Sequence, residues 1–403
     1  MFIKRNITKE LKTLSREFPI VAVLGPRQSG KTTLTQKLFP NHQFVTLEDP
    51  DMREFATLDP RGFLSKYNRK VIIDEIQYCP ELFSYLQGIV DQQRSSGSFI
   101  ITGSENYLMS EKISQSLAGR VGLAILLPFS YTELKTYKKN YTADDLMFTG
   151  FYPPVYNRNI RPASFYSTYV NTYLERDVRK ISQITDFSRF TRFLKLLAGR
   201  TGQLLNKNAL SIEAGISHTT VEKWLSVLEA AYIVFRLQPW FVNFNKRIVK
   251  QPKIYFYDTG LASYLLGLRN IHEIATHYLR GNLFENFIIS ELFKENFNRG
   301  QNFRFWFWRD NHNNEIDLII ETGKQYLAVE IKSGETFRND FVKSLNLWSR
   351  LSNTPAKDLF IIYGGDKSML FQDINILEWK NASSILDTFP QNSCLRHSLK
   401  ISI

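Results

Sequence analysis

At residues 25–32 the chain reads Gly25-Pro26-Arg27-Gln28-Ser29-Gly30-Lys31-Thr32, which is a complete phosphate-loop motif. An apolar run at 20–24 precedes the motif and a helix-like segment at 33–39 follows it, so it lies where a buried strand leads into a helix. Backbone N–H groups of such a loop and the N-terminus of the helix bind phosphate oxygens. The sequence therefore predicts a nucleotide-binding site rather than an accidental glycine turn.

The motif assigns a role to each of its last two residues. We expect the Lys31 ammonium to reach the β and γ phosphates of ATP and the Thr32 hydroxyl to hold Mg²⁺. The residues expected to contact the nucleotide are the loop, the residue after it and one polar residue of a later strand: Gly25, Pro26, Arg27, Gln28, Ser29, Gly30, Lys31, Thr32, Thr33 and Ser104.

Two carboxylates follow a second apolar run. Residues 71–73 are Val-Ile-Ile, typical of a buried parallel strand, and Asp74 and Glu75 come directly after them. Ligands of open α/β sheets bind at the carboxyl ends of the strands. We expect Asp74 to hold Mg²⁺ and Glu75 to polarise the attacking water. After the next apolar run, Ser104 or Asn106 is expected to contact the γ-phosphate, with a simple turn as the alternative.

Composition and charge restrict the class of protein. A chain of 403 residues with 43% hydrophobic and 22% charged residues is long enough for two or three soluble domains. The net charge of +12 and pI near 9.4 favour a polyanionic partner, with nucleic acid ahead of an acidic membrane surface. Two cysteines are too few for a disulfide framework or a cysteine-built zinc site. We expect a cytoplasmic protein without a membrane span, because no apolar run is long enough and the first residues lack a signal-peptide pattern.

The middle of the chain has a helix–turn–helix cadence. Residues 160–200 are rich in helical periodicity, and residues 208–225 then form two helix-like segments around Gly215. Ser217 is expected to cap the second helix, which would bury Val221, Trp224 and Leu225. Such a helix can enter a DNA major groove, but Glu222 beside Lys223 makes a poor phosphate-binding face. DNA contact and simple packing both remain open.

The C-terminal part carries a second set of acids. Glu330 and Lys332 point to one face of a predicted strand, because side chains alternate along a strand. Asp317 on an adjacent predicted strand and Glu285 on a helix are expected to approach the same spot. Three carboxylates suit Mg²⁺ or Mn²⁺, and a neighbouring lysine can activate water against a phosphodiester. The candidate metal ligands here are Glu285, Asp317 and Glu330, and the candidate catalytic residue is Lys332.

These motifs, in this order, resemble the prokaryotic AAA-type ATPases that carry the C-terminal domain of unknown function DUF4143. The resemblance rests on the phosphate loop, Ile-Ile-Asp-Glu-Ile-Gln at 72–77, Ile-Thr-Gly-Ser at 101–104, Ser-Leu-Ala-Gly-Arg-Val at 116–121 and Pro-Phe-Ser-Tyr-Thr-Glu-Leu at 128–134. It implies ATP hydrolysis through Lys31, Thr32, Asp74 and Glu75, with Ser104 as sensor and Arg120 as an arginine finger. Gly150-Phe151-Tyr152-Pro153 departs from the family's usual glycine pair.

The C-terminal acids resemble those of the PD-(D/E)XK restriction-endonuclease-like fold. The expected fold class is therefore α/β, in three parts. Residues 1–155 form a phosphate-loop ATPase unit with a parallel sheet, and residues 156–265 a helical lid and winged-helix-like region. Residues 266–403 form the nuclease-like domain.

Three functional hypotheses follow from the sequence. The first is an ATPase whose nucleotide cycle controls a DNA-directed, metal-dependent nuclease module. The second is a nucleotide-gated interaction protein with an inactive nuclease-like domain that binds a protein partner. The third is an ATP-dependent signalling or toxin–antitoxin-type regulator that acts through the helix–turn–helix. An arginine finger at Arg120 would also require a homo-oligomer.

Overall fold

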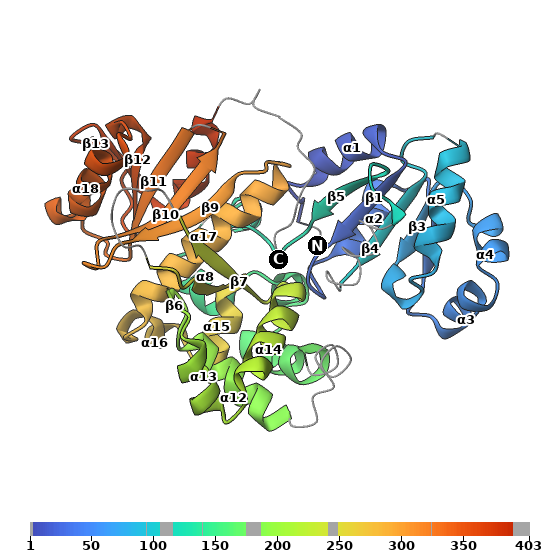
Figure 1. Cartoon of the computed structure of the whole chain (residues 1–403), viewed down its shortest axis with the longest axis horizontal. Helices are drawn as coiled ribbons and strands as arrows, with labels where there is room; N and C mark the ends of the chain where they lie inside the picture. The colour runs from blue at the N-terminus through green and yellow to red at the C-terminus, as the bar shows by residue number, and fades with distance from the viewer. Residues whose placement is uncertain are drawn as a thin grey trace.

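The structure is a computed structural model that describes residues 3–93, 95–104, 116–138, 140–174, 187–240, 249–323 and 325–389. Figure 1 shows the N-terminal unit at the right, the helical middle below and the C-terminal module at the left. Helix α17 (Arg280–Asn298) runs between them. Within the described residues, no helix is long and apolar enough to cross a membrane.

The N-terminal unit is built on a five-stranded sheet in the order β2-β3-β4-β1-β5. All of its pairings are parallel. Its strands are β1 (Ile20–Leu24), β2 (Gln43–Thr46), β3 (Val71–Asp74), β4 (Phe99–Gly103) and β5 (Val121–Ile125). The expectation of an N-terminal parallel sheet is confirmed.

Helices cover both faces of this sheet because successive strand residues point in opposite directions. Val21 and Val23 join one buried cluster, whereas Ile20, Ala22 and Leu24 join another. The first cluster lies under α1 and α2, and the second lies under α4 and α5. The helices of this unit are α1 (Thr8–Glu17), α2 (Lys31–Leu38), α3 (Pro50–Leu58), α4 (Pro60–Lys66), the short 3-10 turn η1 (Ile76–Tyr78), α5 (Leu82–Gln93), α7 (Tyr131–Leu134) and α8 (Ala143–Thr149).

The middle of the chain contains the expected pair of helices. Helix α13 (Lys207–Ala214) ends at Gly215, whose φ of +68° suits glycine, and α14 (His218–Ala230) follows. Ser217 caps α14 by accepting a hydrogen bond from the Thr220 N–H, and Val221, Trp224 and Leu225 are buried, as expected. The other helices here are α9 (Pro153–Asn157), α10 (Pro162–Thr168), the π-helical η2 (Tyr169–Leu174), α12 (Phe187–Ala198), α15 (Thr259–Leu265) and α16 (Ile271–Thr276).

The middle and C-terminal parts share one nine-stranded sheet in the order β13-β14-β12-β11-β10-β9-β7-β8-β6. The two parts join where β7 (Val234–Pro239) pairs in parallel with β9 (Arg304–Arg309). The sheet therefore crosses the boundary expected between residues 265 and 266. Its other strands are β6 (Gln203–Leu204), β8 (Lys253–Phe256), β10 (Glu315–Thr322), β11 (Gln325–Lys332), β12 (Leu359–Tyr363), β13 (Met369–Phe371) and β14 (Ile374–Glu378).

Residues 359–363 form an internal strand of this sheet, β12. Strand β12 lies between β11 and β14, and the hairpin of β13 and β14 forms the edge of the sheet. Helix α18 (Lys343–Ser352) packs on β10 and β11. The C-terminal module also contains the short helices η3 (Asn339–Val342), η4 (Ala356–Asp358) and η5 (Trp379–Thr388).

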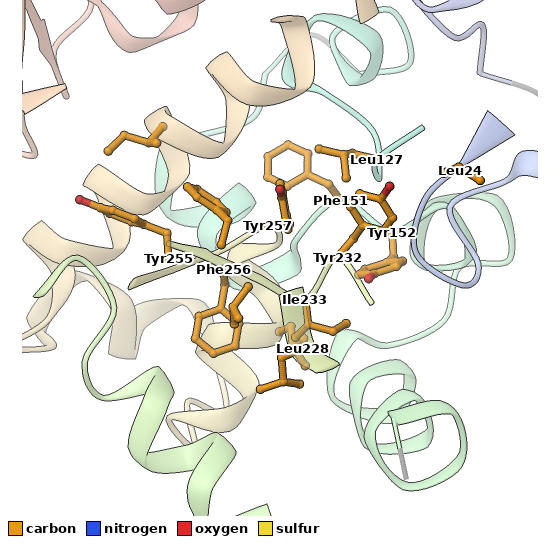
Figure 2. Packing of buried hydrophobic residues seen from close by; sticks show 14 of the residues in the cluster. Leu24, Leu127, Phe151, Tyr152, Leu228, Tyr232, Ile233, Tyr255, Phe256 and Tyr257 are labelled. Carbon is orange, nitrogen blue, oxygen red and sulfur yellow. The ribbon is translucent and has the colours of Figure 1, made fainter. Parts of the chain in front are cut away.

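One hydrophobic core connects the three parts. The same buried cluster contains Leu24 of β1, Phe151 before α9, Leu228 of α14 and Phe256 of β8 (Figure 2). It extends to Phe389 near the end of the described chain. Burial of this many apolar side chains is the main stabilising contribution to the fold.

Asp258 locks the start of α15 to the segment that leads into α9. Its carboxylate accepts hydrogen bonds from the Leu261 N–H at 2.9 Å, the Phe151 N–H at 2.7 Å and the Tyr166 hydroxyl at 2.6 Å. Asp258 thus caps the N-terminus of α15. A Cβ on Gly150 would lie 2.9 Å from the Gly260 Cα and even closer to the Tyr166 hydroxyl, so this crossing requires glycine.

A buried ion pair connects the phosphate loop to the start of α7. Arg5 is 3% exposed; its Nε donates to both carboxylate oxygens of Glu133 at 3.1 Å, and its Nη1 donates to the Ser29 carbonyl at 2.8 Å. Glu133 also accepts hydrogen bonds from two backbone N–H groups, those of Asn6 and Ser130. The pair is therefore fully hydrogen-bonded, as a buried charge must be.

Helix α17 meets this region from the other side. Its Glu291 accepts a hydrogen bond from the Tyr131 N–H at 2.5 Å, and Lys294 pairs with Glu291 at 2.7 Å while lying 3.5 Å from the centre of the Phe151 ring. Glu295 accepts hydrogen bonds from Thr132 and Asn6. The first turn of α7 is thus held between Arg5 and α17.

Replacement of Glu133 by alanine tests this connection. Removing one partner of a buried ion pair leaves the other charge uncompensated, so we expect Glu133→Ala to lower the free energy of unfolding by about 3–5 kcal/mol. Urea denaturation measures the loss. Asp387→Ala is the matched control, because Asp387 is 62% exposed and pairs with Arg299 at the surface; that pair should contribute less than about 1 kcal/mol. Equal losses in the two variants would contradict the prediction.

Candidate functional site

The phosphate loop connects the last residue of β1 to the first residue of α2. Gly25 has a φ of +150°, and a Cβ on it would lie 2.1 Å from the Leu126 carbonyl oxygen. Gly30 has a φ of +94°. Both positions require glycine, as the motif implies. The Ser29 hydroxyl is buried and has no hydrogen-bond partner among the described residues, so the loop has spare polar capacity for a ligand.

Lys31, Thr32 and Asp74 meet at the carboxyl edge of the sheet. The Lys31 ammonium donates to the carbonyl oxygens of Gly25 and Pro26, each at 2.9 Å. The Thr32 hydroxyl donates to Asp74 Oδ1 at 2.8 Å. Hydroxyl and carboxylate oxygens side by side are suitable ligands for Mg²⁺.

Glu75 lies next to this group in an unusual backbone conformation. Its φ of 55° and ψ of 48° place it in the left-handed region, which costs free energy for a residue with a side chain. The Ser104 hydroxyl donates to Glu75 Oε2 at 3.0 Å, and the Gln77 side-chain amide donates to the same oxygen. The strained turn and these two donors fix the direction of the carboxylate.

The two acids differ in their electrostatic environment. Burial raises the pKa of Asp74 and outweighs the hydrogen bonds from Thr102 and Thr32, which lower it. Burial also raises the pKa of Glu75, but Lys31 and its other neighbours more than offset this, so that the pKa of Glu75 is lowered overall. Glu75 is therefore ionised at neutral pH, the state in which a carboxylate can accept a proton from water.

The other loop residues lie around this centre. Arg27 is buried, its guanidinium lies 5.9 Å from the centre of the Tyr173 ring, and it pairs with Glu48 at 3.7 Å. Gln28 is half-buried and has a φ of 62°. Pro26 is buried, and Thr33 is exposed on the first turn of α2. Asn106, the alternative sensor residue, lies outside the described residues.

Sequence reasoning missed two residues at this edge. Thr102 donates to Asp74 Oδ1 at 2.6 Å and accepts a hydrogen bond from the Glu75 N–H at 3.2 Å. Gln77 joins Glu75 to Ser104. A polar threonine directly after the apolar run 99–101 was a signal for the first, because β4 lies next to β3 in the sheet.

Arg120 lies at the amino ends of the strands of the same sheet, opposite the carboxyl ends where the phosphate loop lies. It directly precedes β5, and Val121 pairs with Ile20, the first residue of β1, whereas the phosphate loop follows the last one. Its guanidinium pairs with Asp91, with Nη2 to Oδ2 at 2.9 Å. The structure therefore does not bring Arg120 to the phosphate loop of its own chain.

The four C-terminal candidates do converge. Asp317 Oδ2 accepts a hydrogen bond from the Ile331 N–H at 2.8 Å, and the Lys332 ammonium lies 2.7 Å from Glu330 Oε2. Burial and the nearby Asp317 raise the pKa of Glu330 well above its usual value. Burial, against the opposing charge of Lys253, raises the pKa of Glu285 to about 7. Glu330 Oε1 is buried without a hydrogen-bond partner in the described part of the chain.

Glu285, Asp317 and Glu330, with Lys332, form what we call the acid cluster. Two further charged residues belong to it and were missed. Glu315, Glu285 and Asp317 have carboxylate oxygens within 4.8 Å of one another. Lys253, the first residue of β8, pairs with both Glu285 and Glu315. Glu315 could have been found, because it is two residues from Asp317 on the same strand. Nothing local to Lys253 marks its role, since it arrives from another strand of the sheet.

The helix–turn–helix presents paired charges. Glu222 of α14 binds both Lys207 and Arg236, and Arg236 also pairs with Glu229 at 2.7 Å. Acidic partners thus offset these two cations, so the element offers less positive charge to a phosphate backbone than its sequence suggests.

Three families match successive parts of the chain. Residues 17–135 match the family described as AAA domain, residues 140–272 match DUF8612, and residues 280–381 match DUF4143; the last two are domains of unknown function. Over 378 residues the chain is 30% identical to the uncharacterized protein Rv2008c of Mycobacterium tuberculosis, across 92% of this chain and 82% of that protein. The chain belongs to the family that joins an AAA domain to DUF4143. The N-terminal unit thus has an AAA-type phosphate-loop ATPase fold.

More distant similarities cover comparable lengths. The uncharacterized protein MJ1544 of Methanocaldococcus jannaschii is 22% identical, across 84% of this chain and 82% of its own. Among solved structures, the Walker-type ATPase PABY2304 of Pyrococcus abyssi is 15% identical with a TM-score of 0.45, across 66% of this chain and 96% of its own.

Thr102→Val should change the pH dependence of the site. The Thr102 hydroxyl stabilises the ionised form of Asp74, so its removal should raise the pKa of Asp74 further. As the pH is lowered, Mg²⁺-dependent binding of a fluorescent ATP analogue should then be lost at a higher pH than in the unmodified chain. Ser98→Ala is the control, because Ser98 directly precedes the first residue of β4 and lies at the end of the strand away from Asp74. It should leave the pH at which half of the binding is lost unchanged. A midpoint that does not move in Thr102→Val would contradict the assignment.

Proposed function

We propose that the N-terminal unit binds ATP with Mg²⁺ and hydrolyses it to ADP and phosphate. The observation that carries the proposal is the contact of the Thr32 hydroxyl with Asp74 at 2.8 Å, at the end of the phosphate loop and beside Glu75. These residues are 42 positions apart and come from α2 and β3. Their meeting is what a magnesium nucleotide site at a sheet edge needs.

Each residue of this site has a proposed role. Mg²⁺ held by Thr32 and Asp74 would offset charge on the phosphate oxygens. Lys31 would leave its two carbonyl partners to bind the β and γ phosphates, and loop N–H groups would bind the others. Ionised Glu75 would orient the attacking water and accept its proton, with Ser104 holding the Glu75 carboxylate in place.

Arg120 is proposed to act only on a second copy of the chain. It faces the edge opposite its own phosphate loop, so an arginine-finger role requires a homo-oligomer and release from Asp91. Turnover per chain would then rise with protein concentration.

Two substitutions separate nucleotide binding from hydrolysis. Lys31→Ala removes charge-assisted hydrogen bonds to phosphate, so we expect ATP affinity to fall about 10-fold to 100-fold. Glu75→Gln keeps the shape of the side chain but removes the base, so hydrolysis should fall about 10²-fold to 10⁴-fold with affinity nearly unchanged. Equilibrium binding and phosphate release measure the two effects.

Lys37→Ala is the matched control, because Lys37 lies on the exposed side of the same helix. Unchanged ATP affinity in Lys31→Ala would overturn the proposed site. Normal turnover in Glu75→Gln would overturn only the role of Glu75.

We also propose that the nucleotide cycle of residues 1–155 regulates the rest of the chain, 156–403. Arg5 contacts the phosphate loop at Ser29 and, through Glu133 and α7, the helix that carries Glu285. A change in the loop on ATP binding would therefore reach α17 through packed, hydrogen-bonded groups.

A second candidate function is a DNA-directed, metal-dependent nuclease in the C-terminal module. Convergence of Asp317, Glu330 and Lys332 supports it, as does the net charge of +12. A Mg²⁺ or Mn²⁺ ion would stabilise negative charge on the scissile phosphate, and Lys332 would orient the attacking water. The alternative is an inactive module that binds a protein partner under nucleotide control.

A plasmid-nicking assay separates these two alternatives. The unmodified chain should nick supercoiled DNA with Mn²⁺ or Mg²⁺ in at least one nucleotide state, and Lys332→Ala should abolish nicking because the water is no longer oriented. Lys343→Ala, at an exposed position of α18, serves as control. No cleavage in any nucleotide state, or equal cleavage by Lys332→Ala, would favour the interaction module.

A further inference from the structure

The acid cluster already contains a cation. Lys253 is 3% exposed, and its ammonium lies 2.9 Å from Glu285 Oε1 and pairs with Glu315 as well. These are two of the three carboxylates whose oxygens come within 4.8 Å of one another. A divalent ion in the corner between Glu285, Glu315 and Asp317 would compete with the ammonium for the carboxylates of Glu285 and Glu315.

The position of Lys253 is set by the sheet. It belongs to β8, which pairs antiparallel with β7, and β7 pairs in turn with β9 beside β10. Tyr255, two residues further on the same face of β8, donates its hydroxyl hydrogen bond to Glu285. Strand register therefore delivers both groups to Glu285, so the contact does not depend on a mobile surface side chain.

Charge in the cluster is close to balanced. The four carboxylates of Glu285, Glu315, Asp317 and Glu330 face three cations. These are Lys253, Lys332 and Arg309, whose Nη1 lies 3.1 Å from Glu315. A divalent ion between Glu285 and Glu315 would lie directly beside the buried Lys253 ammonium, and two positive charges held together away from water are unfavourable. The corner formed by Glu285, Glu315 and Asp317 does not fit a metal while Lys253 is present.

We propose that Lys253 is the resident cation of the acid cluster, and that it excludes divalent metal from the corner formed by Glu285, Glu315 and Asp317. Any metal in this cluster is then confined to Asp317 and Glu330, next to Lys332, where Glu330 Oε1 has no hydrogen-bond partner in the described structure. This inference rests on the acid cluster of the second candidate function and reduces the set of residues that can bind a metal there. It holds whether or not the C-terminal module cleaves DNA.

Mn²⁺ binding to the full chain tests the proposal. All variants carry Asp74→Asn, so that the N-terminal site does not contribute, and no nucleotide is added. Lys253→Met keeps the length of the side chain and removes the charge, so we expect Mn²⁺ affinity to increase at least about tenfold by calorimetry. Glu315→Gln should reverse the gain, because Glu315 belongs only to the Lys253 corner. Lys343→Met is the matched control and should gain nothing.

A folded Lys253→Met chain with no gain in Mn²⁺ affinity would overturn the proposal. If Lys253→Met is unfolded without metal, refolding on addition of Mn²⁺, seen as a rise in Tm, supports it. If that variant never folds, the chain that retains Lys253 decides. Its Mn²⁺ affinity should be insensitive to Glu315→Gln, and a loss of affinity would overturn the proposal. Nicking of DNA is measured in a separate assay. An absence of nicking would therefore count against the nuclease function and would not affect the measured Mn²⁺ affinities.

Discussion

Parallel pairing of β1, β4 and β3 is the constraint on which the candidate ATP site depends. In this register Leu24 lies opposite Gly103, and Ile73 lies opposite Ile101, so three strands end at one edge. Lys31, Asp74 and Ser104 each follow or close one of these strands within a few residues. A shift of β3 by one residue would turn Asp74 to the other side of the sheet and separate it from Thr32.

The site at this edge was predictable because its information is local. The phosphate loop and the Val-Ile-Ile-Asp-Glu run each predict their own local structure from their own residues. Parallel α/β topology then brings the two segments together. The left-handed conformation of Glu75 was not predictable, because glutamate rarely adopts it. Thr102 was missed because its partner depends on which strands are neighbours.

The C-terminal cluster was predictable only in part, for a related reason. Glu330, Lys332 and Asp317 come from two consecutive strands, so alternation along a strand was enough to group them. Lys253 comes from a strand separated from Glu315 by two others in the sheet and by about sixty residues in the chain. Its charge reaches the acids only because β7 joins β9, a pairing that no local pattern announces.

The shared nine-stranded sheet has a mechanical consequence. Strand pairing runs from β6 to β13, and the middle and C-terminal halves of this sheet are joined by two residue pairs of β7 and β9, Gln238 with Trp306 and Pro239 with Phe307. In the described structure no strand pairing joins this nine-stranded sheet to the five-stranded sheet. The two sheets are connected by side-chain contacts and by the chain itself. Movement of the phosphate loop would therefore reach the nine-stranded sheet through these side-chain contacts and the connecting chain, as between two separate bodies, and not through a continuous sheet.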